Sequence, residues 1–240
     1  MGRRVPDGRL LLRVTGVSIV QVLPELRASG AAQMALDTGL LQTADKVIAR
    51  RYTWAPAALS LGRFQKYESV AKLSFDVVRR PSGGRAVLHG EDFEWSFAVA
   101  FPAGALGSGT RAGADVDKPY DMVAGAFAGA FEALGVQLDG GRAEPYHRSA
   151  LCFATSLRHD LLARGEKLVA VAQARAGGRV LVHGSVLERR PPEKLVQAAE
   201  TLLGEPWQGE GLAGAGYVLA PEMIWKRVLV RLEAALRAAS

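Results

Sequence analysis

The order in which strand-like and helical segments follow one another constrains the fold of this 240-residue chain more than any other feature. Strand-like segments rich in Val, Ile and Leu are grouped together, and helical patterns stand apart from them. A parallel doubly wound sheet requires strict alternation of strands and helices, which the pattern does not show. We therefore predict an α+β fold with a mixed, largely antiparallel sheet that is flanked by helices.

Apolar periodicity predicts four helices, at residues 30–45, 120–134, 192–203 and 221–238. The last two begin at a proline, a residue favoured in the first turn of a helix. An Ala-Gly-Gly run at residues 176–178 predicts a hairpin. Strands are predicted at residues 10–14, 18–23, 76–80, 86–89, 94–100, 167–172 and 179–187, with two more inside 50–62 that Pro56 separates, and loops at 102–118 and 140–149.

Length and composition predict one globular domain. Hydrophobic residues make up 49% of the chain and charged residues 22%, which excludes bulk disorder. The sequence has no internal repeat, no apolar run long enough for a transmembrane helix and no apolar core of a secretory signal peptide. We expect residues 1–20 to form an N-terminal extension and residues 21–240 to form a single domain.

Cysteine and histidine usage bears on location and on metal binding. Cys152 is the only cysteine, so the chain cannot form an internal disulfide, which is typical of a cytoplasmic protein. A single cysteine also excludes every multi-cysteine metal site. The four histidines lack the HxH and HExxH spacings of zinc ligands. We predict a cytoplasmic protein that binds no metal.

The formal net charge of +6 limits the classes of partner. This charge is consistent either with simple solubility or with an acidic partner. No stretch interleaves Lys and Arg with aromatic residues, so we do not expect nucleic acid as a partner. Nothing in the sequence predicts a membrane as a partner.

Residues 79–89 read Arg-Arg-Pro-Ser-Gly-Gly-Arg-Ala-Val-Leu-His and form the first candidate site. The paired glycines, Gly83 and Gly84, allow a backbone to approach a ligand closely and to present N–H donors. Arg80 offers a planar guanidinium for a carboxylate or a phosphate. The alternative is a tight turn between strands with solvated arginines. The residues alone leave both interpretations open, because the segment matches neither the P-loop nor the dinucleotide-binding pattern.

Two further candidate sites contain groups that can react or titrate. A lysine ammonium near a thiol favours the nucleophilic thiolate, so Cys152 and Lys167 form a candidate pair. A buried cysteine that acts as a small hydrophobe is the alternative, because the spacing does not establish contact. His183 and Gly184 lie at the end of a predicted strand, where a glycine permits close approach of a ligand or of a neighbouring strand. A histidine whose hydrogen bonds are satisfied within the strand is the alternative there.

Five segments, taken in order, resemble the lipoate–protein ligase and octanoyltransferase superfamily. The resemblance covers roughly residues 20 to 237, and no single motif in it is as specific as a P-loop. Cys152-Phe153 ahead of the Lys167 strand is similar to the cysteine nucleophile of the LipM-type octanoyltransferases. The matching segments are residues 34–37, 54–56 with 61–65, 79–89, 152–153, and 165–175 with 181–187, the last of which includes the His183-Gly184 pair.

This resemblance implies a fold like that of class II synthetases and biotinyl–lipoyl protein ligases. It implies a catalytic domain at residues 21–240 that moves an octanoyl or lipoyl group from acyl carrier protein through a thioester on Cys152. The acceptor is a lysine of a lipoyl domain or of glycine cleavage H protein, in lipoate biosynthesis. No ATP and no other cofactor are needed, because the acyl thioester itself drives amide formation.

The resemblance also implies a role for each site residue. Lys167 lowers the pKa of the Cys152 thiol and orients the acyl carbonyl. The residues implied to line the acyl group and its carbonyl are Arg80, Ser82, Gly83, Gly84, Val87, His89, His183 and Gly184.

Three residues depart from the family pattern: Gly90 stands in place of an Asp, and Ala170 and Val171 stand in place of a glycine and a small polar residue. Such changes would reshape the acyl pocket. Two other functions therefore stay open: an ATP-dependent lipoate–protein ligase catalytic domain, and a non-catalytic homologue that binds an acyl group or a carrier.

Overall fold

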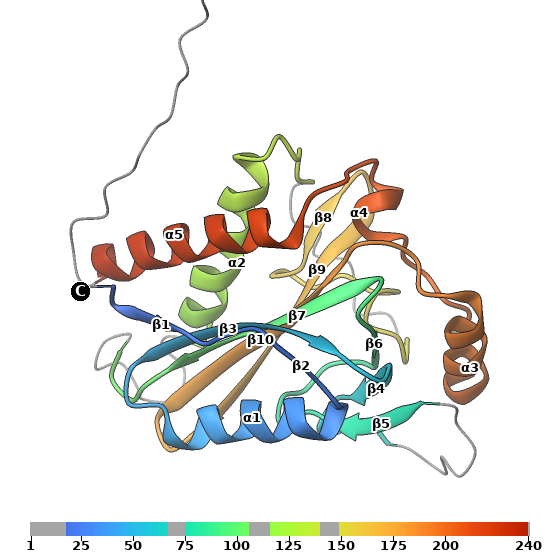
Figure 1. The fold of residues 1–240 in the computed structure, drawn as a ribbon, viewed down its shortest axis with the longest axis horizontal. Coiled ribbons are helices and arrows are strands. Elements are labelled where there is room, and N and C mark those ends of the chain that lie inside the picture. Colours follow the sequence, from blue (N-terminus) through green and yellow to red (C-terminus); the bar gives the residue numbers. More distant parts are fainter. Residues whose placement is uncertain (1–17, 67–74, 106–115, 140–148, 240) are drawn as a thin grey trace, which may run out of the picture.

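The structure is a computed structural model that describes residues 18–66, 75–105, 116–139 and 149–239 (Figure 1). The predicted strand at 10–14, most of the predicted loops at 102–118 and 140–149, and nearly all of the expected extension at 1–20 lie outside the described residues. Among the described residues, no helix is long and apolar enough to cross a membrane.

Seven strands form the main sheet, in the order β1-β3-β7-β10-β9-β8, with β2 also paired to β3. β1 and β2 run parallel to β3, whereas the other pairs are antiparallel, so the predicted mixed, largely antiparallel sheet is confirmed. The strands are β1 (Val20–Val22), β2 (Leu26–Ala28), β3 (Val47–Trp54), β7 (Glu94–Phe101), β8 (Leu161–Ala163), β9 (Glu166–Ala176) and β10 (Arg179–Leu187).

A smaller sheet has the order β5-β4-β6 and lies beside one end of the main sheet (Figure 1). Its strands are β4 (Ala58–Leu61), β5 (Asp76–Arg79) and β6 (Val87–His89). Pro56 separates β3 from β4, as predicted, and the peptide bond before it is cis. The loop of residues 80–86, which contains Gly83 and Gly84 and is called the glycine turn below, joins β5 to β6.

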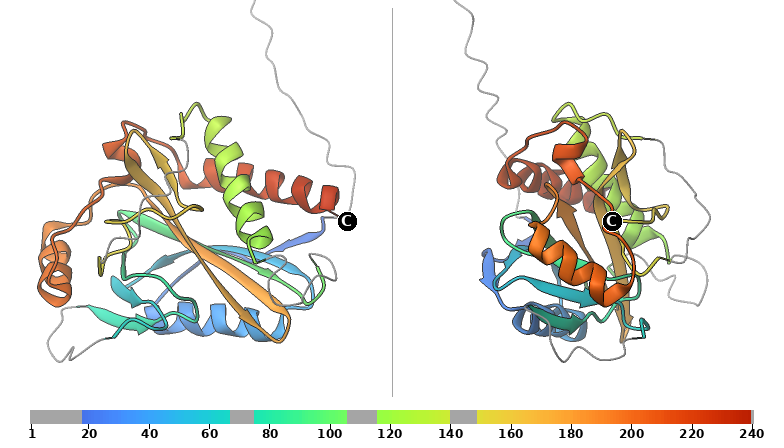
Figure 2. Two further views of the ribbon diagram at one scale, coloured as in Figure 1. Left: turned by 180° about the vertical axis from the view of Figure 1, so that it is seen from behind. Right: turned by 90° about the vertical axis from the view of Figure 1, so that its right-hand side faces the viewer.

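Helices cover both faces of the main sheet (Figures 1 and 2). α1 (Gly30–Thr43) packs on one face through Met34 and Leu41. α2 (Lys118–Glu132) and α5 (Pro221–Ala239) pack together on the opposite face. α3 (Glu193–Leu203) packs against the small sheet, and α4 (Gly211–Gly214) is a single turn near β9 and β10. All four predicted helices are confirmed.

Alternation along β7 separates an apolar face from a polar one, because successive side chains of a strand point to opposite faces. Trp95 and Phe97 pack under α2 and α5. Glu94 and Ser96 face the other way, and both are buried. In the antiparallel register Ser96 lies opposite Ser185 of β10, so the polar face of these two strands forms one wall of an internal site.

Candidate active site

A pocket opens between the polar face of the main sheet and the small sheet, with α1 beneath it. Of the residues expected to form the site, all line this pocket except Ser82 and Gly83. Its lining residues are Met34, Tyr52, Arg80, Gly84, Arg85, Val87, His89, Ser96, Cys152, Thr155, Leu157, Asp160, Lys167, Ala170, Val171, Ala172, His183, Gly184 and Ser185.

One wall of the pocket is apolar and comes from β9. Ala170 and Val171, which depart from the family pattern, both line this wall and are at least nine-tenths buried. The methyl group of Ala170, which lies opposite Ser185, favours contact with hydrocarbon over contact with a polar ligand. This wall is therefore chemically suited to an acyl chain.

Cys152 and Lys167 come together at this pocket. Lys167 lies on β9, and its Nζ donates a hydrogen bond of 2.7 Å to the backbone carbonyl oxygen of Cys152. The same ammonium forms an ion pair of 2.7 Å with Asp160, and both side chains are only 3% exposed. The contact from Lys167 to Cys152 thus reaches the backbone of the cysteine.

The loop that carries Cys152 is anchored to the segment that follows the glycine turn. The Cys152 N–H donates to the carbonyl of Ala86, and the Ala86 N–H donates to the carbonyl of Ala150. Ala86 and Leu151 form an isolated parallel bridge. The two motifs, separated by more than sixty residues, are therefore joined through their backbones.

Burial raises the pKa of the Cys152 thiol above its usual value, because the low-polarity surroundings disfavour the thiolate. The Lys167 ammonium opposes this effect, as do Arg80 and Arg85, whereas Asp160 adds to it. The charge of Lys167 acts to lower the thiol pKa, and the role expected of Lys167 stays a prediction. Burial outweighs this charge, so the net shift of the thiol pKa is upward.

Arg80 connects β4 to the glycine turn. One terminal nitrogen donates to the carbonyl and the hydroxyl of Ser60, each at 2.8 Å. The other donates to the carbonyls of Gly83 and Arg85. The guanidinium lines the pocket, but its terminal nitrogens already bind oxygen atoms of the protein, which favours a supporting role over ligand binding.

The two glycines of the turn differ in what they require. Gly84 has φ of +96°, a conformation that a residue with a Cβ rarely adopts. A Cβ on Gly83 would meet no atom within 4 Å. Gly84 also lies against Gly62. A Cβ added to Gly62 would be 2.0 Å from the carbonyl oxygen of Gly84. Backbone conformation and packing therefore explain Gly84 and Gly62, independently of any ligand.

Gly184 permits close approach of neighbouring strands. A Cβ at this position would lie 2.1 Å from the carbonyl oxygen of Ala170 and 2.7 Å from the Phe97 ring. The sequence left open whether Gly184 admits a ligand or a neighbouring strand, and the structure shows that a neighbouring strand approaches it. Gly90 has a similar explanation, because a Cβ there would lie 2.5 Å from the ring of Phe93.

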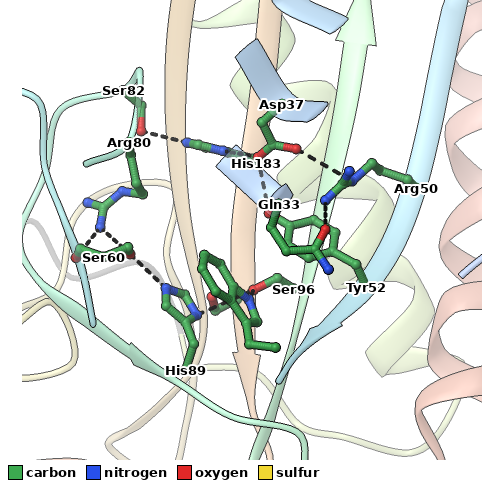
Figure 3. Close-up of polar contacts among 12 residues, drawn as sticks. Gln33, Asp37, Arg50, Tyr52, Ser60, Arg80, Ser82, His89, Ser96 and His183 are labelled. Atoms are coloured by element: carbon green, nitrogen blue, oxygen red, sulfur yellow. Dashed lines mark hydrogen bonds and ion pairs between the residues drawn. The ribbon is translucent and has the colours of Figure 1, made fainter. Parts of the chain in front are cut away.

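His183 is the centre of a buried polar chain (Figure 3). Its Nε2 lies 2.6 Å from the hydroxyl oxygen of Ser82, and its Nδ1 lies 2.7 Å from Asp37 of α1. Ser82 therefore contributes to the site through His183. Asp37 also accepts a hydrogen bond from Tyr52 and pairs with Arg50 at 3.5 Å.

His89 is the centre of a second chain (Figure 3). Its Nε2 lies 2.6 Å from the Ser60 hydroxyl, its Nδ1 lies 3.0 Å from Glu94, and the Trp54 ring stacks on it at 3.9 Å. Burial lowers the pKa of His89 well below its usual value and raises the pKa of Glu94 well above it. Both groups are therefore favoured in their neutral forms.

Two acidic residues of the site were not singled out from the sequence. Asp37 lies within a segment that carried the family resemblance, and its burial on an apolar helix face is the signal that it serves a polar partner. Asp160 ends a turn, in which its N–H donates to the carbonyl of Leu157, and its side chain contacts Lys167.

A polar groove borders the other side of Lys167. Lys167 and Thr155 line both the pocket and this groove, so the two hollows adjoin at the candidate catalytic pair. Glu166 and Glu205 line the groove, and their carboxylates accept hydrogen bonds from backbone N–H groups. An outside group can therefore approach Lys167 without passing through the apolar pocket.

Comparison with curated proteins supports the same family. The octanoyltransferase LipM of Carboxydothermus hydrogenoformans is 33% identical over 180 residues, which cover 70% of this chain and 64% of that protein. The octanoyltransferase LipM of Bacillus subtilis is 34% identical over 188 residues, covering 70% and 65%. The chain thus spans slightly less than two thirds of the length of each of these relatives.

Solved structures show the fold. Protein Ta0514 of T. acidophilum with bound lipoic acid has a TM-score of 0.65 at 18% identity, covering 92% of this chain and 86% of that one. Lipoate-protein ligase A bound with ATP has a TM-score of 0.61 at 16% identity, covering 92% and 85%. The lipoate-ligase-like fold expected from the sequence is confirmed. The lipoyl protein ligase A/B catalytic domain matches residues 29–202, well over half of the sequence, and the chain belongs to that family.

Proposed function

We propose that this protein is an acyltransferase that moves an octanoyl group from acyl carrier protein to a lysine of a lipoyl domain or of glycine cleavage H protein. The observation that carries the proposal is the placement of the chain's single cysteine beside the buried Lys167 ammonium and an apolar wall. The name octanoyltransferase LipM, borne by the curated relatives, supports the same reaction.

The reaction proceeds in two balanced steps. The Cys152 sulfur attacks the carbonyl carbon of the donor thioester, and the donor thiol leaves with the proton that Cys152 gives up. A neutral lysine amine of the acceptor then attacks the Cys152 thioester, an amide forms, and the cysteine thiol is regenerated with a proton from the amine. Covalent catalysis replaces one encounter of three proteins with two separate encounters of two.

Lys167 stabilises the charge that develops in both steps. In each tetrahedral intermediate the carbonyl oxygen becomes negative, and a fixed ammonium in a buried site stabilises that charge strongly. Ala170 and Ala172 contact the hydrocarbon chain, while Arg80 and the His183 and His89 chains hold the opposite wall in shape. Burial raises the pKa of the Cys152 thiol, so the thiol gives up its proton in the course of its attack on the donor thioester.

The acceptor lysine reaches the thioester through the polar groove. The groove adjoins the pocket at Lys167 and Thr155, so the acyl chain can occupy the pocket while the amine arrives from the other side. The charge of +6 favours association with acidic carrier proteins and lipoyl domains. We further propose that residues 21–240 form the single catalytic domain and that the protein works in the cytoplasm.

The test is transfer from octanoyl acyl carrier protein to an apo lipoyl domain, with the wild type and with Cys152→Ala, in the presence and absence of ATP. We expect wild-type transfer without ATP and none with the variant. Transfer of free octanoate that requires ATP and survives Cys152→Ala would show a ligase instead. Binding of the acyl carrier protein without transfer under either condition would show a non-catalytic homologue.

A further inference from the structure

Asp160 is a buried carboxylate that no part of the proposed reaction yet uses. It lies immediately before β8, and it is 5% exposed. Its Oδ2 pairs with Lys167 at 2.7 Å and accepts a hydrogen bond of 2.8 Å from the Leu157 N–H. Its Oδ1 accepts one of 3.2 Å from the Val171 N–H of β9. One side chain therefore ties together the loop after Cys152, the lysine and the apolar wall.

The contacts of Lys167 leave one donor for a ligand. An ammonium carries three N–H donors. Asp160 takes one and the carbonyl oxygen of Cys152 takes another. Among the residues that the structure describes, the third has no hydrogen-bond acceptor, and the nearest aromatic ring, that of Phe153, is centred 5.9 Å away. Because two donors are fixed, the direction of the third is fixed as well.

The position of Asp160 is at odds with a lysine whose only task is to stabilise the thiolate. The charged groups that face Cys152 are Lys167, Asp160, Arg80 and Arg85. Asp160 is the only anion among them, and its charge opposes formation of the thiolate. A buried carboxylate beside Lys167 therefore helps catalysis only if the ammonium is required at an atom other than the Cys152 sulfur.

We propose that Asp160 is a positioning residue that holds the Lys167 ammonium at the acyl carbonyl oxygen and away from the sulfur of Cys152. This inference rests on the proposed acyl transfer and deepens it. The carboxylate and the Cys152 carbonyl oxygen each fix one of the three donors of the buried ammonium, and the third then meets the oxygen that becomes negative. Asp160 itself touches neither substrate nor sulfur.

Asp160→Asn tests the proposal, because it removes the charge and keeps the size. In the variant the ammonium is free to pair with the thiolate. We therefore expect the pH midpoint of Cys152 alkylation by iodoacetamide to fall. Acyl transfer should fall at the same time, by about ten- to a hundredfold, since the oxygen loses its positioned donor. A thiol that reacts more readily in an enzyme that transfers more slowly is the expected signature.

Asp139→Asn is the matched control. The Asp139 carboxylate also accepts two backbone hydrogen bonds, from the N–H groups of Arg164 and Gly165, but it contacts neither Lys167 nor Cys152. We expect this control to leave both the alkylation midpoint and the transfer rate at wild-type values. Asp160→Glu serves if Asp160→Asn does not fold: it keeps the charge but moves the carboxylate, so the midpoint should stay and transfer should fall.

Each outcome bears on one claim. Transfer at the wild-type rate by Asp160→Asn would overturn the inference, and so would reduced transfer with an unchanged or higher alkylation midpoint, which indicates a purely structural carboxylate. For Asp160→Glu, undiminished transfer would overturn it. Failure of the wild type itself to transfer the octanoyl group would instead remove the proposed function, and the alkylation profiles do not depend on that result.

Discussion

The two buried histidine chains of the pocket have the same geometry and opposite electrostatics. Each histidine has a serine hydroxyl 2.6 Å from Nε2 and a carboxyl group within 3.0 Å of Nδ1. Asp37, beside His183, pairs with Arg50. Glu94, beside His89, has serine hydroxyls around it, and burial raises its pKa well above the usual value. Hydrogen-bond geometry alone therefore does not reveal whether a buried acid is charged.

The difference indicates distinct tasks for the two chains. The His183 chain links α1, β3 and β10 to the glycine turn through a charged pair. The His89 chain holds the small sheet against the main sheet through neutral hydrogen bonds and ring stacking. Replacing the acidic residue by its amide should therefore cost much stability in the His183 chain and little in the His89 chain.

Asp37→Asn should have the largest effect on stability. The variant leaves the Arg50 guanidinium, 3% exposed, without its counter-ion, and breaking a buried pair in this way costs about 3–5 kcal/mol. The measurement is the free energy of unfolding from urea titration. Asp121→Asn is the control, because Asp121 on α2 also contacts an arginine and a histidine but is 53% exposed, and it should change stability by less than about 1 kcal/mol. Equal costs for the two variants would contradict the comparison.

Tyr52→Phe should have an intermediate effect. The Tyr52 hydroxyl donates to Asp37 at 3.1 Å in a buried setting, and a hydrogen bond to a charged group contributes about 1.5–3 kcal/mol. Tyr217→Phe is the control, because the Tyr217 oxygen accepts an exposed hydrogen bond from the Gln137 N–H. A loss for Tyr52→Phe no greater than that for the control would contradict the comparison, because the buried Tyr52 hydroxyl would then contribute no more than an exposed one.

Glu94→Gln should have the smallest effect near neutral pH, because it replaces a neutral carboxyl group with an amide of the same shape, at a cost of about 1 kcal/mol or less. Its pH dependence is the sharper test. A carboxyl group whose folded pKa is raised contributes stability at low pH, and that contribution is lost as pH rises through the folded pKa. Glu94→Gln should therefore become more stable relative to wild type as pH rises. An opposite trend would show that Glu94 is an anion paired with His89.

The sequence predicted the framework well and the polar chains poorly. The β9–β10 hairpin followed from alternation and a glycine turn, and the four helices followed from their apolar period. β2, β8 and the single turn α4 were missed. Ser82 and His183 are 101 residues apart, and no local pattern shows that they meet.

The contact between Cys152 and Lys167 could not be predicted from the sequence. The role of Cys152 was inferred from the resemblance, because the spacing between Cys152 and Lys167 did not establish contact. Lys167 does reach the cysteine, but through its backbone oxygen, and Asp160 completes the arrangement. Side-chain direction within a strand and the path of an irregular loop decide these contacts, and both depend on tertiary packing.

The most direct test of the account is the intact mass of the protein after a single turnover with octanoyl acyl carrier protein, without ATP and without acceptor. We expect one octanoyl adduct, located on Cys152 by peptide mapping, that is lost when an apo lipoyl domain is added and appears on that domain's lysine. Formation of octanoylated lipoyl domain without any adduct on Cys152, or an adduct that the acceptor never removes, would contradict the covalent role of Cys152.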